Sequence, residues 1–277
     1  MRISAKTKMC IIIGDPVEHS LSPAMHNRAY EELGIDNQFV YVGARVKIKN
    51  VRSVVEAMKV MNIRGLTCTI PHKIEVMKYL DWIDETAKKI GAVNSVVNDD
   101  GVLKGYNTDW LGVVTPLERI TSLKNKKVAV LGAGGVARSI IFGVQKKGAQ
   151  VTVLSRTLEK AKQLAGEFEC EATSLSNKLT IQQANILINA TPIGMHPYES
   201  KTPMDTSLIT KNHIVFDAVY IPYETQLLKV ARKRSAKIIH GVEMLLYQGT
   251  AQFELYTNYK APEKVMRKVL YDKLIRK

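Results

Sequence analysis

The chain has 277 residues, a length typical of about two domains that each bury their own core. Hydrophobic residues make up 45% of the sequence and charged residues 24%, which excludes an intrinsically disordered chain and a membrane-embedded one. Lys and Arg outnumber Asp and Glu by 40 to 26, so the net charge of +14 would attract any anionic partner and identifies none.

Short apolar runs alternate with amphipathic segments through the first part of the chain. Strands are expected at 10–14, 38–42, 65–70, 93–98 and 102–106, and helices after Ser22-Pro23, over 51–61 and from near Pro71. This alternation is typical of βα units that form a mostly parallel sheet. The run Asp99-Asp100-Gly101 predicts a hairpin turn between the last two strands. A first α/β unit should therefore end near residue 109.

A second series of the same kind begins at Lys126. After a strand that runs into a glycine turn, we expect a helix at 137–148, a strand at 149–155, a helix at 157–168 and strands at 184–190, 213–219 and 236–240. This order predicts a doubly wound nucleotide-binding domain. The segments 242–256 and 262–275 are two expected helices with no strand between them, so from the pattern alone they could cap either domain.

The strongest local motif is GAGGVA at 132–137, which follows the strand VAVL and opens a helix. Glycines there allow a pyrophosphate to approach the backbone, and the helix N-terminus offers N–H groups and a partial positive charge. Ala137 takes the place of the third glycine. The alternative is a tight strand-to-helix turn without a ligand, but the context favours dinucleotide binding.

The next strand ends at Ser155-Arg156-Thr157, where an NAD enzyme would usually carry an acidic residue for the ribose 2′-hydroxyl. An Arg between two hydroxyl residues suits a 2′-phosphate instead, because guanidinium pairs with phosphate through two parallel hydrogen bonds. A solvated Arg at a helix start is the alternative. The sequence therefore favours NADP as the cofactor.

Polar residues gather in the turn after the first strand, which includes Ser20 and Ser22. Taken alone, Ser22-Pro23 indicates a helix N-cap followed by Pro at the first helical position. Two serines at the carboxyl end of a parallel strand are also well placed to bind a carboxylate.

Lys73 and Asp109 are candidates for proton transfer. Lys73 follows a strand and is expected to open a helix, where a positive charge is unfavourable against the helix dipole and therefore indicates another task. Asp109 stands at the expected domain junction, where helix capping is the alternative. A Lys and an Asp brought together across a cleft would favour each other's charged form and could move a proton.

Other features of the sequence argue against several further classes of protein. Cys10, Cys68 and Cys170 form no CxxC pair, and the six His residues lack metal-site spacing, so we expect no disulfide framework, no metal and a cytoplasmic location. The N-terminal apolar stretch is too short for a signal peptide, and no run approaches the ~18 apolar residues of a membrane span. The basic stretch 260–277 predicts an amphipathic helix with a solvated face, which makes nucleic acid an unfavoured partner.

Together these segments resemble the shikimate dehydrogenase family, which reduces 3-dehydroshikimate with NADPH in aromatic amino-acid biosynthesis. Five segments match in order over nearly the whole chain: GDPVEHSLSPAMHN, TIPHK, GAVNSV with YNTD, GAGGVARS with SRT, and GVEMLLYQGTAQFELY. The resemblance implies two α/β lobes with a cleft between them. It places a substrate-binding and catalytic domain at 1–109 plus 245–277, and an NADP-binding Rossmann domain at 110–244.

The resemblance also implies roles for individual residues. Lys73 and Asp109 match the catalytic pair, and Ser20 and Ser22 match the residues that hold the substrate carboxylate. The ring hydroxyls would be bound by Thr69, Asn94, Asp109 and Gln248, with Tyr220 nearby. The residues matching the NADP site are Glu85, Gly132, Ala133, Gly134, Gly135, Val136, Ser155, Arg156 and Thr157, with Ala218 and Gly241 at the nicotinamide end.

Three positions depart from the family pattern. Thr67 replaces a more usual Asn, which should loosen a supporting hydrogen bond. Ser155 replaces an Asn but leaves Arg156 in place, so the phosphate preference should persist. Ala218 replaces a larger apolar residue and should pack the nicotinamide less tightly.

The expected activity is therefore reversible, NADPH-dependent reduction of 3-dehydroshikimate to shikimate. Two alternatives stay open. One is a quinate or mixed quinate/shikimate dehydrogenase, including an NAD-linked one. The other is a non-catalytic NADP sensor or a basic nucleic-acid-binding protein on the same fold. The sequence gives no signal for the oligomeric state. A homodimer is compatible with it.

Overall fold

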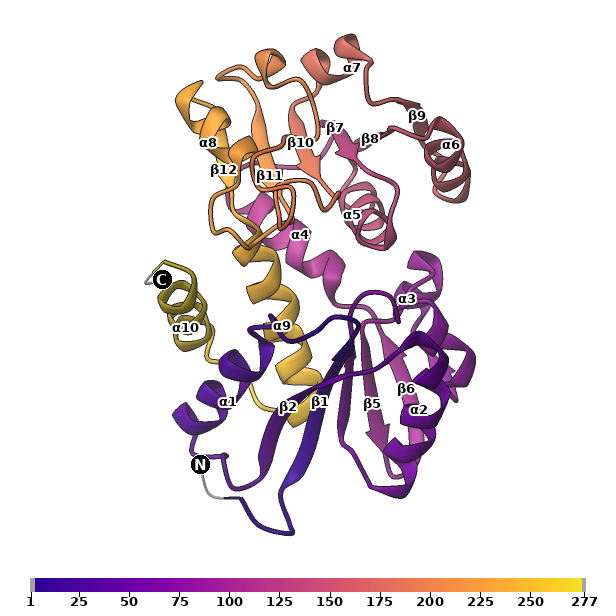
Figure 1. The fold of residues 1–277 in the computed structure, drawn as a ribbon. Coiled ribbons are helices and arrows are strands. Elements are labelled where there is room, and N and C mark those ends of the chain that lie inside the picture. The colour runs from indigo at the N-terminus through magenta and orange to yellow at the C-terminus, as the bar shows by residue number, and fades with distance from the viewer. Residues whose placement is uncertain (1–2, 276–277) are drawn as a thin grey trace. The chain divides into compact units, whose positions relative to one another are not determined.

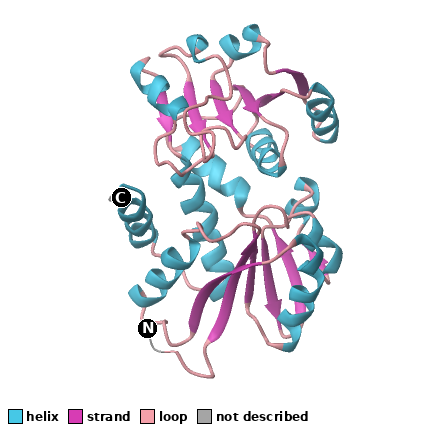
Figure 2. Cartoon of the chain, in the orientation of Figure 1, coloured by secondary structure: helices cyan, strands magenta, loops and turns pink. Residues whose placement is uncertain are grey.

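The computed structural model describes residues 3–275 (Figure 1). Its internal contacts divide the chain into two compact units. The first unit comprises Met1–Thr108 and Gln248–Lys277, and the second comprises Asp109–Tyr247. Both are α/β units, as the distribution of helices and strands in Figure 2 shows.

The first unit contains a six-stranded mixed sheet in the order β2-β1-β3-β5-β6-β4. Its strands are β1 Lys8–Gly14, β2 Phe39–Arg45, β3 Gly65–Cys68, β4 Trp82–Ile83, β5 Ser95–Asp99 and β6 Val102–Tyr106. Three of the five strand pairings are parallel, and β5 runs antiparallel to both β3 and β6. The predicted hairpin is confirmed: Asp100 and Gly101 have φ values of 51° and 89°, which Asp and Gly tolerate in tight turns.

Helices of the first unit flank this sheet. They are α1 Ser22–Glu32, η1 Ile48–Asn50, α2 Val51–Val60, η2 Glu75–Tyr79, α3 Glu85–Ile90 and α10 Glu263–Ile275, together with the later part of α9 Gly241–Thr257. Apolar residues of α2 such as Val55 and Met58 pack on Leu66 and Val96 of the strands. The prediction of a helix that begins near Pro71 is wrong. The His72 N–H donates to the Thr69 carbonyl three residues back, so residues 70–74 form turns and the short 3₁₀ helix begins at Glu75.

The second unit contains an entirely parallel six-stranded sheet in the order β12-β11-β10-β7-β8-β9. Its strands are β7 Lys127–Leu131, β8 Gln150–Ser155, β9 Glu171–Ser174, β10 Ile186–Asn189, β11 Ile214–Asp217 and β12 Lys237–Ile239. Read from β9, this is the 3-2-1-4-5-6 order of a doubly wound dinucleotide fold, with the switch between β7 and β10. The predicted architecture is confirmed.

Both faces of that sheet are covered, because alternate strand residues point to opposite sides. Val128 and Val130 join a core that includes α5 Gly135–Lys146 and α6 Leu158–Glu167, whereas Ala129 and Leu131 join a second core with α8 Gln226–Lys233. The remaining helices are α4 Asp109–Glu118, α7 Lys178–Gln183 and η3 Thr206–Leu208.

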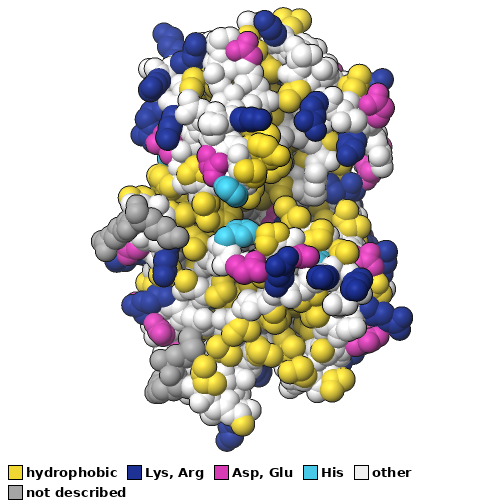
Figure 3. All heavy atoms as spheres, viewed as in Figure 1, with side chains coloured by type: hydrophobic (Ala, Val, Ile, Leu, Met, Phe, Trp, Pro, Cys, Tyr) yellow, Lys and Arg dark blue, Asp and Glu magenta, His cyan; other side chains and the backbone are white. Residues whose placement is uncertain are grey.

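The two C-terminal helices are confirmed as α9 and α10. In α10, Met266 and Leu270 are buried while Lys268 is exposed, so the helix is amphipathic, and the last two residues of the basic stretch lie outside the described residues. Lys and Arg side chains are spread over both units and interspersed with acidic ones on the face drawn in Figure 3. Among residues 3–275, none of the helices combines the length and apolar character needed to cross a bilayer.

Candidate functional site

The carboxyl ends of β1 and β3 approach each other closely in the first unit. The Asp15 N–H donates to the Ile70 carbonyl at 3.1 Å, and the Thr69 N–H donates to the Ile13 carbonyl at 3.0 Å. A Cβ on Gly14 would lie only 2.5 Å from the Thr69 methyl carbon, so glycine is required for this approach. The turn that carries the two serines is thereby held beside Thr69.

Ser22 does not cap helix α1, so the capping interpretation is wrong. It is the first helical residue, the N-cap position is Leu21, and no side-chain cap bond forms there. Ser22 is buried, and its N–H donates to Ser20 Oγ at 3.3 Å. Both hydroxyls therefore lie at the start of an eleven-residue helix, where backbone N–H groups and the helix dipole favour an anion.

Lys73 lies within the turn after β3. The argument from the helix dipole is therefore wrong for Lys73, but its backbone is fixed on both sides. The buried His72 donates from Nε2 to the Val46 carbonyl at 2.7 Å, and the Val93 N–H donates to the Lys73 carbonyl at 2.9 Å. The Lys73 turn is thus tied to the segment that carries Asn94.

Asn94 is buried between β3 and the end of β6. Its N–H donates to the Tyr106 carbonyl at 3.0 Å, and its carbonyl accepts from the Cys68 N–H at 2.9 Å. The side chain joins Thr108: Asn94 Nδ2 donates to Thr108 Oγ1 at 2.9 Å, and the Thr108 N–H donates to Asn94 Oδ1 at 2.8 Å. The first unit thus gathers Ser20, Ser22, Thr69, Lys73 and Asn94 around one end of its sheet.

Three other predicted site residues lie elsewhere on the chain. Asp109 directly follows Thr108, is buried and is the first residue of α4 in the second unit. Gln248 is buried on α9. Glu85 begins α3, where its side chain is 75% exposed and pairs with Lys88 at 2.7 Å. Asp84, which accepts from the N–H groups of Thr86 and Ala87, caps this helix.

The glycine turn of the second unit fits the pyrophosphate of a dinucleotide. Gly132 has a φ of 114°, and a Cβ there would lie 2.9 Å from the Thr191 methyl carbon. A Cβ on Gly134 or Gly135 would meet no atom within 4 Å, so the backbone is open on that side. Gly134 is the N-cap of the twelve-residue helix α5 and has no side chain to cap it, so no capping side chain occupies the N–H groups at the helix start.

The end of β8 supplies a cation beside this turn. The Leu154 carbonyl accepts from the Gly132 N–H at 2.7 Å, which joins the two strand ends. Arg156 is exposed and, within residues 3–275, forms no ion pair with a carboxylate. Ser155 Oγ accepts from the Thr157 N–H at 3.3 Å. A free guanidinium between two hydroxyls suits a phosphate.

A buried carboxylate that sequence reasoning missed organises the loops after β10 and β11. Asp217 accepts from Asn189 Nδ2 at 2.8 Å, from the Val219 N–H at 3.0 Å and from Thr225 Oγ1 at 2.6 Å. Desolvation raises the pKa of this carboxyl to about 6. Its signal in the sequence is a polar residue that ends an apolar strand, as Asn189 does in the neighbouring strand.

The loop after β11 also carries the expected nicotinamide-end residues. A Cβ on Gly241 would lie 2.3 Å from the Val219 carbonyl oxygen and 2.8 Å from that of Ala218, so α9 can begin there only with glycine. Tyr220 is the residue after Val219, and burial raises the pKa of its hydroxyl to about 12. Ala218 and Gly241 are therefore neighbours within the second unit.

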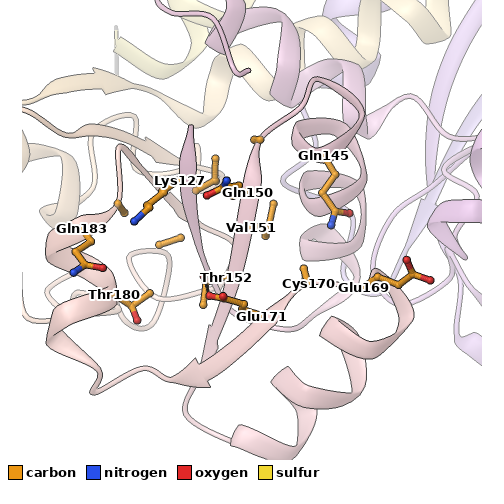
Figure 4. Close-up of a pocket in the computed structure, with 14 residues that line it drawn as sticks. Lys127, Gln145, Gln150, Val151, Thr152, Glu169, Cys170, Glu171, Thr180 and Gln183 are labelled. Carbon is orange, nitrogen blue, oxygen red and sulfur yellow. Dashed lines mark hydrogen bonds between the residues drawn. The ribbon is translucent and has the colours of Figure 1, made fainter. Parts of the chain in front are cut away.

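A cavity of about 650 Å³ lies at the end of the second sheet opposite to the glycine turn (Figure 4). Its lining includes Lys127, Gln150 and Glu171, which begin β7, β8 and β9. Ligands of doubly wound sheets bind at the carboxyl ends of the strands, whereas this cavity lies at the amino ends. None of the predicted site residues lines it.

The comparisons with known proteins agree with this geometry. Residues 12–96 match the model of the shikimate dehydrogenase substrate binding domain, residues 116–218 that of shikimate/quinate 5-dehydrogenase, and residues 241–271 that of the shikimate 5′-dehydrogenase C-terminal domain. The NADP(+)-dependent shikimate dehydrogenase of Methanosphaera stadtmanae is 42% identical, with 97% of this chain and 99% of that protein covered.

Solved structures show the same similarity. A shikimate dehydrogenase in complex with NADP+ is 40% identical, with a TM-score of 0.93 and coverage of 98% of this chain and 97% of that one. The quinate dehydrogenase of Corynebacterium glutamicum in complex with NAD is 29% identical, with a TM-score of 0.88 and coverage of 96% and 99%. The chain belongs to the shikimate and quinate dehydrogenase family.

Proposed function

We propose that this chain is an oxidoreductase that catalyses the reversible NADPH-dependent reduction of 3-dehydroshikimate to shikimate, a step of aromatic amino-acid biosynthesis. The observation that carries the proposal is the 42% identity to an NADP(+)-dependent shikimate dehydrogenase over 97% of the chain. In this proposal residues 1–109 and 245–277 form the substrate-binding and catalytic domain, and residues 110–244 form the NADP-binding domain.

The substrate carboxylate binds to the hydroxyls of Ser20 and Ser22. The position of both serines at the start of α1 supports this assignment, because a helix N-terminus favours an anion. The ring hydroxyls are bound by Thr69, Asn94, Asp109 and Gln248, with Tyr220 nearby. All of these side chains can donate or accept hydrogen bonds, and hydroxyl groups do both.

The pyrophosphate of NADP binds to the backbone of residues 132–136, where the open side of Gly134 and Gly135 supports the assignment. Ser155, Arg156 and Thr157 bind the 2′-phosphate, and Ala218 and Gly241 line the nicotinamide end. Glu85 is retained as a cofactor residue on family resemblance alone, since its side chain pairs with Lys88.

NADPH, when bound, supplies the hydride for the C3 carbonyl carbon. Lys73 and Asp109 act on the carbonyl oxygen. The Lys73 ammonium donates a hydrogen bond to that oxygen, stabilises the negative charge that develops on it and transfers the proton that completes the hydroxyl. The Asp109 carboxylate accepts the hydrogen bond of the hydroxyl that forms and so orients the same oxygen. In the reverse direction the Lys73 amine, left neutral by that transfer, takes the hydroxyl proton back.

Quinate dehydrogenase activity is the second candidate, because the similarity to the NAD-bound quinate enzyme covers 96% of this chain. Quinate carries an additional hydroxyl beside its carboxylate. Arg156, which follows β8 without an acidic neighbour, favours NADP over NAD.

The test is reduction of NADP+ and NAD+ by the purified chain with shikimate and, separately, with quinate. The highest kcat/KM is expected for shikimate with NADP+. A higher value for quinate or for NAD+ would contradict the corresponding part of the proposal. Binding of NADP+ without turnover of either acid would favour the non-catalytic sensor.

We also propose a cytoplasmic location. The thiols of Cys10 and Cys68 are free and buried, and desolvation raises the pKa of each to about 12, which suits a protein kept reduced. The expected homodimer is tested by sedimentation of the purified chain.

A further inference from the structure

A continuous line of buried side chains runs through the first unit from β3 to the end of β6. Its members are Thr67, Gln252, Ser95, Asn94 and Thr108. None of these residues is more than 5% exposed. The line joins α9 to Asn94, and each side chain along it donates a hydrogen bond to the next, from Thr67 to Thr108. At its end, the N–H and the hydroxyl of Thr108 also donate back to Asn94 Oδ1.

Gln252 sets that direction, because the two ends of its amide differ. Its Oε1 lies 3.4 Å from Thr67 Oγ1, which donates to it, and its Nε2 donates to Ser95 Oγ at 3.0 Å. Since the Ser95 oxygen accepts this bond, its own proton is directed to Asn94 Oδ1 at 2.8 Å. An amide nitrogen can only donate, so the polarity cannot reverse while Gln252 keeps this orientation.

The start of the line is anchored by two tyrosines. Tyr41 donates to Thr67 Oγ1 at 2.6 Å, and the Tyr256 hydroxyl lies 2.9 Å from the same oxygen. Burial raises the pKa of both tyrosines, so both hydroxyls stay protonated at neutral pH. The Thr67 hydroxyl thus has three side-chain partners, of which Gln252 Oε1 at 3.4 Å is the most distant.

The end of the line fixes the orientation of the Asn94 amide. Asn94 Oδ1 accepts from Ser95 Oγ and from the Thr108 N–H, each at 2.8 Å, while Nδ2 donates to Thr108 Oγ1. Rotating the amide by half a turn would place its NH₂ group against two donors. Each donor would lose its acceptor in a buried site, which is costly.

We propose that Gln252 is a positioning residue, which acts through Ser95 to hold the Asn94 amide with its NH₂ group as the donor toward a ring hydroxyl of the substrate. The inference rests on the proposed function, in which Asn94 binds that ring. Gln252 also follows Gln248 by four residues on α9, so the two glutamines lie on the same side of the helix.

The test compares Gln252→Met, Ser95→Ala and the double variant with the wild-type chain. Methionine keeps the length of the side chain and removes both hydrogen bonds. Each single variant should raise the KM for shikimate about two- to tenfold, the effect of one hydrogen bond, while the KM for NADP+ and kcat change less. Because both variants interrupt one line, the double variant should resemble Ser95→Ala instead of adding the two effects. Ser95→Thr, which restores the hydroxyl, should restore the KM.

A wild-type KM for shikimate in Gln252→Met, or additive effects in the double variant, would overturn the inference. Equal increases in the KM for both substrates would indicate a merely structural role and would also overturn it. A wild-type chain that does not turn over shikimate would overturn the proposed function instead. The orientation of Asn94 would then be read from its side-chain amide protons by NMR, where a shift in Gln252→Met supports the positioning role and an unchanged signal contradicts it.

Discussion

The ring of His26 stacks on the ring of Tyr41, with the centroids 4.3 Å apart and the planes inclined by 15°. His26 is fully buried, and neither of its ring nitrogens has a hydrogen-bond partner within the described residues. Desolvation lowers the pKa of its imidazole to about 3. His26 thus behaves as a neutral aromatic ring in the core between α1 and β2.

Replacement of His26 by Phe should make the chain more resistant to acid. The pKa in the folded chain lies below the unfolded value of 6.5, so the stability linked to His26 is present above pH 6.5 and is lost as the pH falls toward about 3. The full loss is of order 5 kcal/mol. The melting temperature of His26→Phe should therefore fall less than that of the wild type between about pH 7 and pH 4.

His196→Phe is the matched control, because His196 is 86% exposed and pairs with Glu199 on the surface. It should leave the acid dependence of the melting temperature unchanged. Parallel curves for His26→Phe and the wild type would show that His26 is not kept neutral by burial.

The sequence predicted most of the fold because most elements carry a strong local signal. Apolar runs such as that of β7 alternate with amphipathic helices, and Asp100-Gly101 fixes the hairpin. Strand β9 escaped prediction because it is a short edge strand without a buried residue. The error at Pro71 has a different cause: residues 70–74 are held by bonds to other segments, which local sequence does not reveal.

The candidate site was predicted less completely than the fold. Motifs indicate which residue types stand at strand ends, and the open glycine turn at Gly134 could be predicted in this way. Hydrogen-bond partners that lie far apart in the sequence could not be predicted. Asp217 joins Asn189 and Thr225 only after three segments have folded together, and Gln252 lies 157 residues from Ser95. Both resemble ordinary polar residues in the sequence.

Asp217→Asn should change the pH dependence of stability. The pKa of Asp217 is raised from 3.8 to about 6, so its contribution to stability is present below pH 3.8 and is lost as the pH rises through 6. The loss is of order 3 kcal/mol. Asparagine keeps the shape of the side chain and does not ionise. The melting temperature of Asp217→Asn, relative to that of the wild type, should therefore rise from about pH 4 to pH 7. A constant difference would contradict this account.

Arg156→Gln should weaken the binding of NADP+ far more than that of NAD+. The guanidinium is proposed to pair with the 2′-phosphate, which NAD+ lacks, and a hydrogen bond to a charged group is worth about 1.5–3 kcal/mol, or roughly 10- to 100-fold in KM. Steady-state kinetics with both cofactors measure the ratio. Lys160→Gln, which removes an exposed cation from nearby α6, is the control and should preserve the preference. An unchanged ratio in Arg156→Gln would place the 2′-phosphate elsewhere.

Gly241→Ala should disturb the loop at Ala218 because the added Cβ would lie 2.3 Å from the Val219 carbonyl oxygen. Backbone must move to relieve this contact, so we expect a loss of about 1–3 kcal/mol of stability and a higher KM for NADP+. Gly166→Ala on α6 adds the same atom where nothing lies within 4 Å and should stabilise the chain by roughly 0.5–1 kcal/mol. Equal melting temperatures for the two variants would argue against a close approach at Gly241.

Lys73→Met should lower kcat far more than the affinity for shikimate. The ammonium is proposed to stabilise charge that develops on the oxygen only in the transition state, and general acid–base groups typically contribute about 10²- to 10⁴-fold. Methionine keeps the length of the side chain, and the turn around Lys73 is held by backbone bonds from Val93 and by His72, so the fold should persist. The Kd for shikimate, measured by calorimetry, should change much less than kcat. Lys78→Met removes an exposed lysine a few residues away and should retain wild-type turnover. Turnover at the wild-type rate in Lys73→Met would exclude this lysine from the chemistry, because no other group of the first unit is assigned to the proton.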